Sequence, residues 1–154
     1  MKSTEAFDMR NSGFCAATWR CCYHLAFAPS NRALGAYRMV RCDMEAILQR
    51  LCRELEVGVL LLKSDASYVH MRLNIPPWYC PLVVVQYLRA ASSIELLRRY
   101  PHLAHILSDR MFWADGFLLN TRAPSKQVIQ NYINKQLQAD WVAECGCTEA
   151  SNQS

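Results

Sequence analysis

One long amphipathic helix, placed between strand-like segments, most constrains the fold of this chain. Apolar side chains recur at helical spacing over residues 37–56, at Val40, Met44, Ile47, Leu48, Leu51 and Leu55. Before this helix, residues 18–28 (TWRCCYHLAFA) are rich in aromatic and apolar side chains and stop at Pro29, which indicates a strand. A helix with one apolar face has to cover a sheet or another helix. We therefore expect a mixed α and β domain.

A hairpin and further helices are expected next. Residues 59–63 (VLLLK) and 68–75 (YVHMRLNI) read as strands, and the turn-forming Ser64-Asp65-Ala66-Ser67 separates them. Pro81 suits the first turn of a helix that runs to about residue 90. The Ser92-x-x-Glu95 motif predicts a capping box for a separate short helix that ends near residue 100.

The last third of the chain completes the pattern. Residues 112–113 and 116–120 predict a fourth strand, and Pro124 and Ser125 begin a helix with apolar Val128, Ile129, Ile133 and Leu137. The order βαββαβα predicts an α+β fold of the ferredoxin-like split βαβ type, a four-stranded antiparallel sheet with helices packed on it. We expect a flexible N-terminus over residues 1–17, one domain over residues 18–142 and a polar tail over residues 143–154.

Composition narrows the function classes. The chain has 154 residues, 52% of them hydrophobic, which suits one domain with a full core. Its net charge of +4 permits nucleic-acid binding without requiring it. No apolar run has the length of a membrane span, and the first residues lack the apolar stretch of a secretory signal. We expect a cytoplasmic protein with no membrane contact.

Eight cysteines are numerous for a chain of this length. Without a visible secretory signal, they read as reduced and mostly buried thiols. Cys145-Gly146-Cys147 and Cys21-Cys22-x-His24 raise the alternative of zinc binding. Neither has the paired C-x-x-C spacing of a structural zinc site, so packing is the favoured interpretation.

The candidate site combines a strand and a helix. Alternation along residues 68–75 places Tyr68, His70 and Arg72 on one face of a strand. Tyr132 and Gln136 are four residues apart and stack on one face of a helix. An imidazole and an amide oxygen can share a hard divalent metal, and a tyrosine hydroxyl beside them can break a phosphodiester bond as a nucleophile. A third ligand is expected two residues before His70, but that position holds Tyr68.

Five segments, taken in order from about Trp19 to Gln136, resemble the small single-tyrosine transposases of bacterial insertion sequences (the IS two-hundred and six-hundred-and-five type of the HUH nuclease superfamily). The segments are Cys22-Tyr23-His24-Leu25-Ala26-Phe27, Asp65-x-x-Tyr68-Val69-His70-Met71-x-x-x-Ile75-Pro76-Pro77, Val85-x-Tyr87-Leu88-Arg89-x-x-Ser92-Ser93, Phe112-Trp113-Ala114-Asp115-Gly116-Phe117 and Val128-Ile129-x-x-Tyr132-Ile133-x-x-Gln136. Each segment alone is weak evidence, and their shared order is what makes the resemblance specific.

The resemblance implies a role for each matched residue. Tyr132 is the nucleophile that attacks single-stranded DNA and forms a 5′-phosphotyrosyl link. His70 and Gln136 are ligands of Mg²⁺ or Mn²⁺, and Tyr68 stands where the family has a further histidine. Family members are homodimers that recognise DNA hairpins near the ends of the element. Phosphate contacts need cations, and the candidates that we single out are Arg20, Lys63, Arg72 and Arg89.

Three interpretations stay open at this point. The first is an active transposase that nicks and rejoins single-stranded DNA. The second is a degenerate relative that keeps DNA binding without cleavage, because a phenol with a pKa near ~10 is a neutral and poor ligand for Mg²⁺ at pH 7. The third is a ferredoxin-like RNA-binding module, for which Tyr23, Phe27 and Tyr68 supply only a loose aromatic pattern. His24, on the first strand, is expected to be structural.

Overall fold

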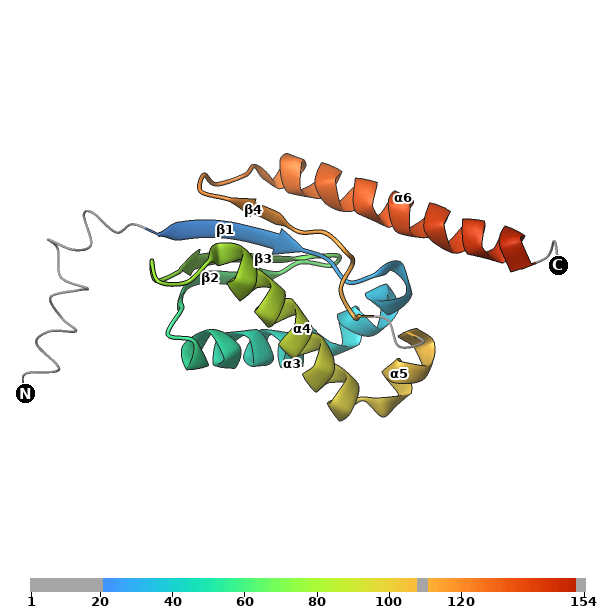
Figure 1. Ribbon diagram of the computed structural model, residues 1–154, viewed down its shortest axis with the longest axis horizontal. Coiled ribbons are helices and arrows are strands. Elements are labelled where there is room, and N and C mark those ends of the chain that lie inside the picture. The colour runs from blue at the N-terminus through green and yellow to red at the C-terminus, as the bar shows by residue number, and fades with distance from the viewer. Residues whose placement is uncertain (1–20, 108–110, 152–154) are drawn as a thin grey trace, which may run out of the picture.

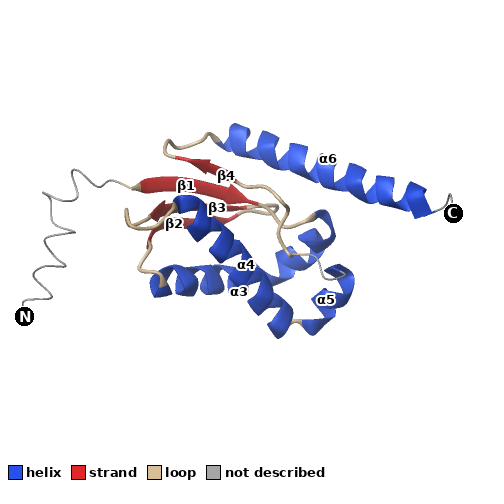
Figure 2. Cartoon of the chain, in the orientation of Figure 1, coloured by secondary structure: helices blue, strands red, loops and turns tan. Residues whose placement is uncertain are grey.

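The computed structural model describes residues 21–107 and 111–151, with side chains described to residue 138. Figures 1 and 2 show the arrangement of the elements. In chain order they are β1 (Cys22–Phe27), the 3-10 helix η1 (Asn31–Ala33), α3 (Leu34–Glu54), β2 (Gly58–Ser64), β3 (Val69–Asn74), α4 (Pro81–Arg99), α5 (Pro101–Leu107), β4 (Leu118–Asn120) and α6 (Lys126–Ser151).

The four strands form one antiparallel sheet in the order β2-β3-β1-β4. β1 lies in the centre, paired with β3 on one side and β4 on the other. This is the strand order of the ferredoxin-like split βαβ fold, so the predicted fold class is confirmed. The hairpin predicted from residues 59–63 and 68–75 is formed by β2 and β3, with a register irregularity between Val59 and Leu61.

The two faces of the sheet carry different clusters. Leu25 and Phe27 of β1 and Val69 and Met71 of β3 pack in the main core, which the apolar side chains of α3 and α4 complete. The alternate residues face the other way, where α6 lies in Figure 1. That second cluster is small and consists of Ala26, Ala28, Tyr68, Ile129 and Ile133, with Leu118, Tyr132 and Leu137 packed against it. The candidate site therefore lies on the thinner side of the molecule.

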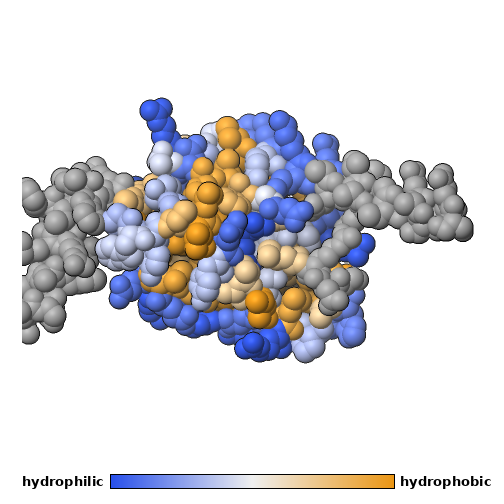
Figure 3. Space-filling view, in the orientation of Figure 1, coloured by the Kyte–Doolittle hydropathy of each residue, from blue (hydrophilic) through white to orange (hydrophobic). Residues whose placement is uncertain are grey.

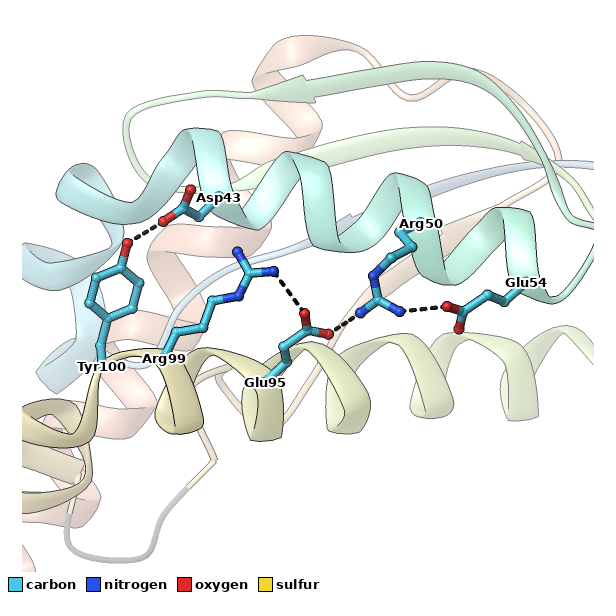
Figure 4. A network of polar contacts seen from close by, with 6 residues as sticks. All are labelled: Asp43, Arg50, Glu54, Glu95, Arg99 and Tyr100. Carbon is cyan, nitrogen blue, oxygen red and sulfur yellow. Dashed lines mark hydrogen bonds and ion pairs between the residues drawn. The ribbon is translucent and has the colours of Figure 1, made fainter.

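A polar network joins α3 to α4 at the surface (Figure 4). The Glu95 carboxylate accepts a hydrogen bond from Arg50 of α3 and another, at 3.0 Å, from Arg99 of its own helix. Tyr100 donates its hydroxyl to Asp43 of α3. The side chains of Arg50 and Arg99 are more than two-fifths exposed, and exposed pairs of this kind contribute about 0–1 kcal/mol. Apolar packing, rather than these pairs, holds the two helices together.

Two sequence predictions about the elements are wrong. Residues 81–99 form one continuous helix instead of two, because Ser92 is buried inside α4 and its hydroxyl donates to the Arg89 carbonyl at 3.1 Å. Its side chain therefore bonds to the preceding turn of α4 instead of capping a new helix. The fourth strand is shorter than expected, since β4 covers only Leu118–Asn120 and Trp113 makes an isolated bridge with Pro29.

Side-chain exposure corrects two further expectations. Of the five cysteines in the described residues, only Cys52 is buried, while Cys42 and Cys80 are exposed. Val128, expected on the apolar face of the last helix, is exposed, whereas Ile129 and Ile133 are buried. The predicted flexible segment 1–17 lies outside the described residues, and α6 continues past residue 143 to Ser151. Within the described residues, no helix has the length and apolar character needed to cross a membrane.

Large apolar side chains are exposed on α4. Leu82, Val83 and Tyr87 lie in its first two turns, with Ile94 further along, and each is more than two-fifths exposed. Figure 3 shows hydrophobic side chains gathered on this side of the molecule, over the N-terminal half of α4. Scattered apolar side chains are normal at a protein surface, but a contiguous group is a feature of contact surfaces.

Candidate functional site

His70 projects from β3 on the face opposite the main core. It pairs in register with Ala26 of β1, and the next pair on the same face, two residues toward the start of β1, is His24 with Arg72. His24 Nδ1 lies 3.4 Å from His70 Nε2, and the two rings stack with centroids 5.7 Å apart. Burial lowers the pKa of His70, and His24 and Lys63 lower it further. Burial and then Arg72 lower the pKa of His24. Both rings therefore favour the neutral form, which is the form that ligates metals.

Tyr68 lies on the same face as His70, as the alternation predicts, but inside the apolar cluster. Only 5% of its surface is exposed. Its ring packs with Ala26, Ala28, Ile129 and Ile133. Burial raises the pKa of its hydroxyl, and the carboxylate of Asp65, which hydrogen bonds that hydroxyl, raises it further. Tyr68 is therefore a neutral phenol that packs α6 against the sheet.

Local capping and burial position the helix that carries Tyr132 and Gln136. Ser125 accepts a hydrogen bond from the Val128 backbone N–H at 3.2 Å, which satisfies one free donor at the start of α6. Ile129 and Ile133 then press the helix onto the sheet. The prediction of a helix beginning at Pro124 and Ser125 is thus confirmed.

Tyr132 and Gln136 meet at Gly116, the residue that precedes Phe117 and β4. A β carbon at position 116 would lie 2.6 Å from Tyr132 Oη and 1.9 Å from Gln136 Nε2, which is closer than non-bonded atoms approach. The Tyr132 hydroxyl and the Gln136 amide therefore occupy the space that a side chain at position 116 would fill. Burial raises the pKa of Tyr132 while Arg89 opposes the shift. Gln136 Oε1 is buried and has no hydrogen-bond partner among the described residues.

The predicted phosphate-contact residues fall in different places. Lys63 and Arg72 are exposed, and Arg72 Nε donates to Cys22 Sγ at 3.2 Å. Lys63 pairs in register with His70, so these two side chains share a face. Arg89 is only 6% exposed, and the expectation that it lines an open DNA path is wrong, because its side chain turns inward to the Ala114 carbonyl. Arg20 lies outside the described residues.

Sequence reasoning missed the contributions of His24 and Gly116, and it gave Arg89 a different role, as a phosphate contact. His24 was expected to be structural, yet it lies beside His70 because β1 pairs with β3 in this register. Gly116 lies in the loop before β4, against Tyr132 and Gln136, and Arg89 contacts the same loop from α4. The signal for Gly116 was its place inside a segment that resembles the family. Within the described residues, no group of three or more His, Cys, Asp or Glu side chains is placed to hold a metal ion.

The fold and the site together define a class. It is an α+β domain in which one face of the sheet carries His70 and lies under α6, the helix that presents Tyr132 and Gln136 one turn apart. The family model described as "Transposase IS200 like" matches residues 17–136, and the chain belongs to this family. The resemblance seen in the five sequence segments is thereby confirmed.

Individual relatives agree with this assignment. The chain is 33% identical over 126 residues to the transposase for insertion sequence element IS200 of Salmonella typhimurium (strain LT2), a match that covers 82% of this chain and 83% of the relative. The corresponding Salmonella typhi transposase matches with the same identity and coverage. A crystal structure of a Deinococcus radiodurans R1 protein assigned as a transposase superimposes with a TM-score of 0.66. That match has 24% identity and covers 75% of this chain and 89% of the other, and it supports the fold.

Proposed function

We propose that this chain is a cytoplasmic transposase that binds, nicks and rejoins single-stranded DNA at insertion-sequence ends, with Tyr132 as the nucleophile. The observation that carries the proposal is the meeting of the Tyr132 hydroxyl and the Gln136 amide at Gly116. Membership of the IS200-like transposase family supports the reaction class. DNA hairpins or single strands at the ends of the element are the proposed partners.

The reaction follows from the chemistry of a tyrosine oxygen. Tyr132 Oη attacks the scissile phosphorus, the bond from phosphorus to the 3′ oxygen breaks, and the phenolic proton leaves to solvent or a base. The products are a 5′-phosphotyrosyl link and a free 3′ hydroxyl. Attack by a 3′ hydroxyl on that link rejoins DNA and restores Tyr132. The phosphotyrosyl bond conserves the energy of the broken phosphodiester, so rejoining needs no nucleotide cofactor. Partial burial of Tyr132 limits the access of water to the intermediate.

The residues fit a divalent metal only in part. His70 supplies a neutral imidazole, and Gln136 supplies a buried amide oxygen that has no partner in the part of the chain that the structure describes; these two would hold Mg²⁺ or Mn²⁺. Tyr68 supplies no ligand, because it is neutral and packed among Ile129, Ile133 and two alanines. When bound, such an ion polarises a phosphate oxygen and favours attack on phosphorus. We therefore propose weak metal binding in this chain.

A nicking assay tests the proposal. Single-stranded DNA from the flanks of the coding region of this protein is incubated with the protein and Mn²⁺ or Mg²⁺, and covalent protein–DNA product is separated on a denaturing gel. Tyr132→Phe is the matched control, since it removes the attacking oxygen and keeps the ring. We expect adduct with the wild type and none with Tyr132→Phe. Adduct formation by the variant at the wild-type rate would refute the assignment of Tyr132.

A second candidate function is DNA binding without cleavage. The burial of Tyr68 in an apolar cluster, at a position where the family has a metal ligand, favours it. The same assay separates the two functions. A degenerate protein would shift the mobility of hairpin DNA in native gels in a salt-sensitive manner and give no covalent product under any metal condition.

We further propose that the chain acts as a homodimer, as the resemblance implies. The exposed apolar side chains of α4, among them Leu82 and Val83, offer a surface for a second copy. Light scattering at micromolar concentration should report about twice 17.7 kDa. Val83→Glu should shift the mass toward the monomer if this surface is used. A monomer at all concentrations would refute the dimer.

A further inference from the structure

Arg89 is a buried cation with an incomplete set of hydrogen bonds. It projects from α4 and donates from Nη2 to the Ala114 carbonyl, while its Cζ lies 5.4 Å from the centroid of the Phe117 ring. Nε is buried without a hydrogen-bond partner among the described residues. Burial lowers the pKa of the guanidinium, whereas Asp115 and Tyr132 oppose that shift. Burying a charge costs several kcal/mol, and an apolar side chain of similar size often serves stability as well or better.

The segment that Arg89 contacts, residues 112–117, is fixed at several points. Its first residue, Phe112, donates its backbone N–H to Ser93 Oγ at 2.9 Å. Trp113 donates from Nε1 to Ser92 Oγ at the same distance. The Ala114 N–H donates to the Ala28 carbonyl at 2.9 Å. Arg89 adds the contacts at Ala114 and Phe117, on either side of Gly116.

Gly116 lies between the two positions that Arg89 holds. The Tyr132 hydroxyl and the Gln136 side chain fill the space above it. The atoms that a β carbon would meet are the far ends of two flexible side chains, so Gly116→Ala would displace these functional groups without rebuilding the backbone. Position 116 is therefore a place where the arrangement of the site can be changed with little effect on the fold.

We propose that Arg89 and Gly116 are positioning residues: Arg89 holds residues 114–117 in place, and Gly116 leaves the space in which the Tyr132 hydroxyl and the Gln136 amide lie side by side. The catalytic importance of this arrangement rests on the proposed function. The arrangement itself does not, so it is tested by a measurement that needs no cleavage.

The test uses 3-fluorotyrosine incorporated into the full chain and ¹⁹F NMR. Among the signals of the seven tyrosines, the Tyr132 resonance is the one that disappears in Tyr132→Phe. The variants are Arg89→Met, Arg89→Lys and Gly116→Ala. The matched control is Arg98→Met, an exposed arginine on the same helix. Circular dichroism and thermal unfolding report whether each variant is folded.

We expect Arg89→Met and Gly116→Ala to move the Tyr132 resonance and Arg98→Met to leave it unchanged. Arg89→Lys should give an intermediate shift, since an ammonium reaches one carbonyl but lacks the planar face that stacks on Phe117. Covalent adduct formation should fall about 10- to 100-fold in Arg89→Met and Gly116→Ala, as expected for a small misplacement of a reacting group. DNA affinity should be unchanged in both.

A purely structural role for Arg89 predicts the opposite pattern: lower stability, with the Tyr132 resonance of the folded protein at its wild-type position. That result in Arg89→Met would overturn the proposal. If Arg89→Met does not fold, an unchanged resonance in Gly116→Ala and Arg89→Lys would overturn it. A wild type that forms no adduct, combined with moved resonances in the variants, would refute the proposed reaction and leave the positioning intact.

Discussion

Tyr68→His is the substitution whose outcome discriminates best between the interpretations of this chain. The wild-type ring is 5% exposed and packs with Ala26, Ala28, Ile129 and Ile133. A histidine fills less of this cluster and gives up the hydrogen bond to Asp65, and together these losses are estimated at about 1–3 kcal/mol. For a chain of this size each kcal/mol corresponds to about 2–4 °C in the melting temperature. Without metal, the variant should therefore melt several degrees below the wild type.

The same substitution adds an imidazole on the face that carries His70. A ligand that binds only the folded state stabilises it by about 2.7 kcal/mol when present at 100 times its Kd. If Tyr68→His completes a metal site, Mn²⁺ at that level should raise the melting temperature of the variant by about 5–10 °C. The wild type should respond much less, because Tyr68 supplies no ligand.

Thermal unfolding with a MnCl₂ titration, against an EDTA reference, measures both effects. Tyr68→His/His70→Ala is the control, because it keeps the smaller ring in the cluster and removes the second imidazole. In the nicking assay, Tyr68→His should raise metal-dependent cleavage at least ~10-fold, which corresponds to about 1.4 kcal/mol on the barrier. An equal rise in melting temperature for the wild type and the variant would refute the view that Tyr68 weakens the site.

Three further predictions concern the rest of the molecule. Glu56 follows α3 with a φ of 58°, and its N–H and that of Val57 donate to carbonyls of the last turn. Because glycine adopts this left-handed conformation without strain, Glu56→Gly should raise the free energy of unfolding, measured by urea titration, by about 0.5–1 kcal/mol. Burial raises the pKa of the Cys52 thiol to about 12. In single-cysteine variants at neutral pH, Cys52 should therefore resist maleimide labelling, whereas the exposed Cys42 and Cys80 should be labelled within minutes. Fast labelling of folded Cys52 would contradict the packing. If Lys63 and Arg72 contact phosphates, changing either one to Gln should reduce the slope of log K against log salt for single-stranded DNA by about 0.7, and an unchanged slope would remove that residue from the interface.

The parts of the fold that the sequence predicted well are those that depend on local pattern. The apolar spacing from Val40 to Leu51 identified α3, because those side chains are the ones buried against the sheet. The hairpin of β2 and β3 followed from a polar turn between apolar runs. The division of α4 was predicted wrongly because Ser92, three residues before Glu95, looks like a capping residue in isolation, and Ser93 follows it. In the structure both hydroxyls bond to residues 112 and 113, which are distant in sequence.

The candidate site likewise has parts that follow from local sequence pattern and parts that depend on tertiary contacts. His70, Tyr132 and Gln136 could be singled out as candidates because strand alternation, helical spacing and the family resemblance act over a few residues. The His24 contact depends on the register between β1 and β3, and the place of Gly116 depends on how α6 lies over the sheet. Arg89 was predicted as a phosphate contact because such contacts need cations, and only the tertiary contacts of residues 112–117 reveal its inward direction.

The separation of the two sheet faces explains how the Tyr68 change is compatible with a folded protein. The main core lies between the sheet and the helices α3 and α4, and none of the candidate site residues belongs to it. Tyr68 belongs to the smaller cluster under α6, where a large aromatic ring contributes packing that a metal-ligating histidine would not. We therefore expect tyrosine at this position to favour the docking of α6 and to weaken the proposed metal binding. The larger core lies on the opposite face of the sheet, so a chain of this family can stay folded whether the proposed site is active or inactive. The nicking assay on the wild type, with Tyr132→Phe as control, decides which of the two this chain has.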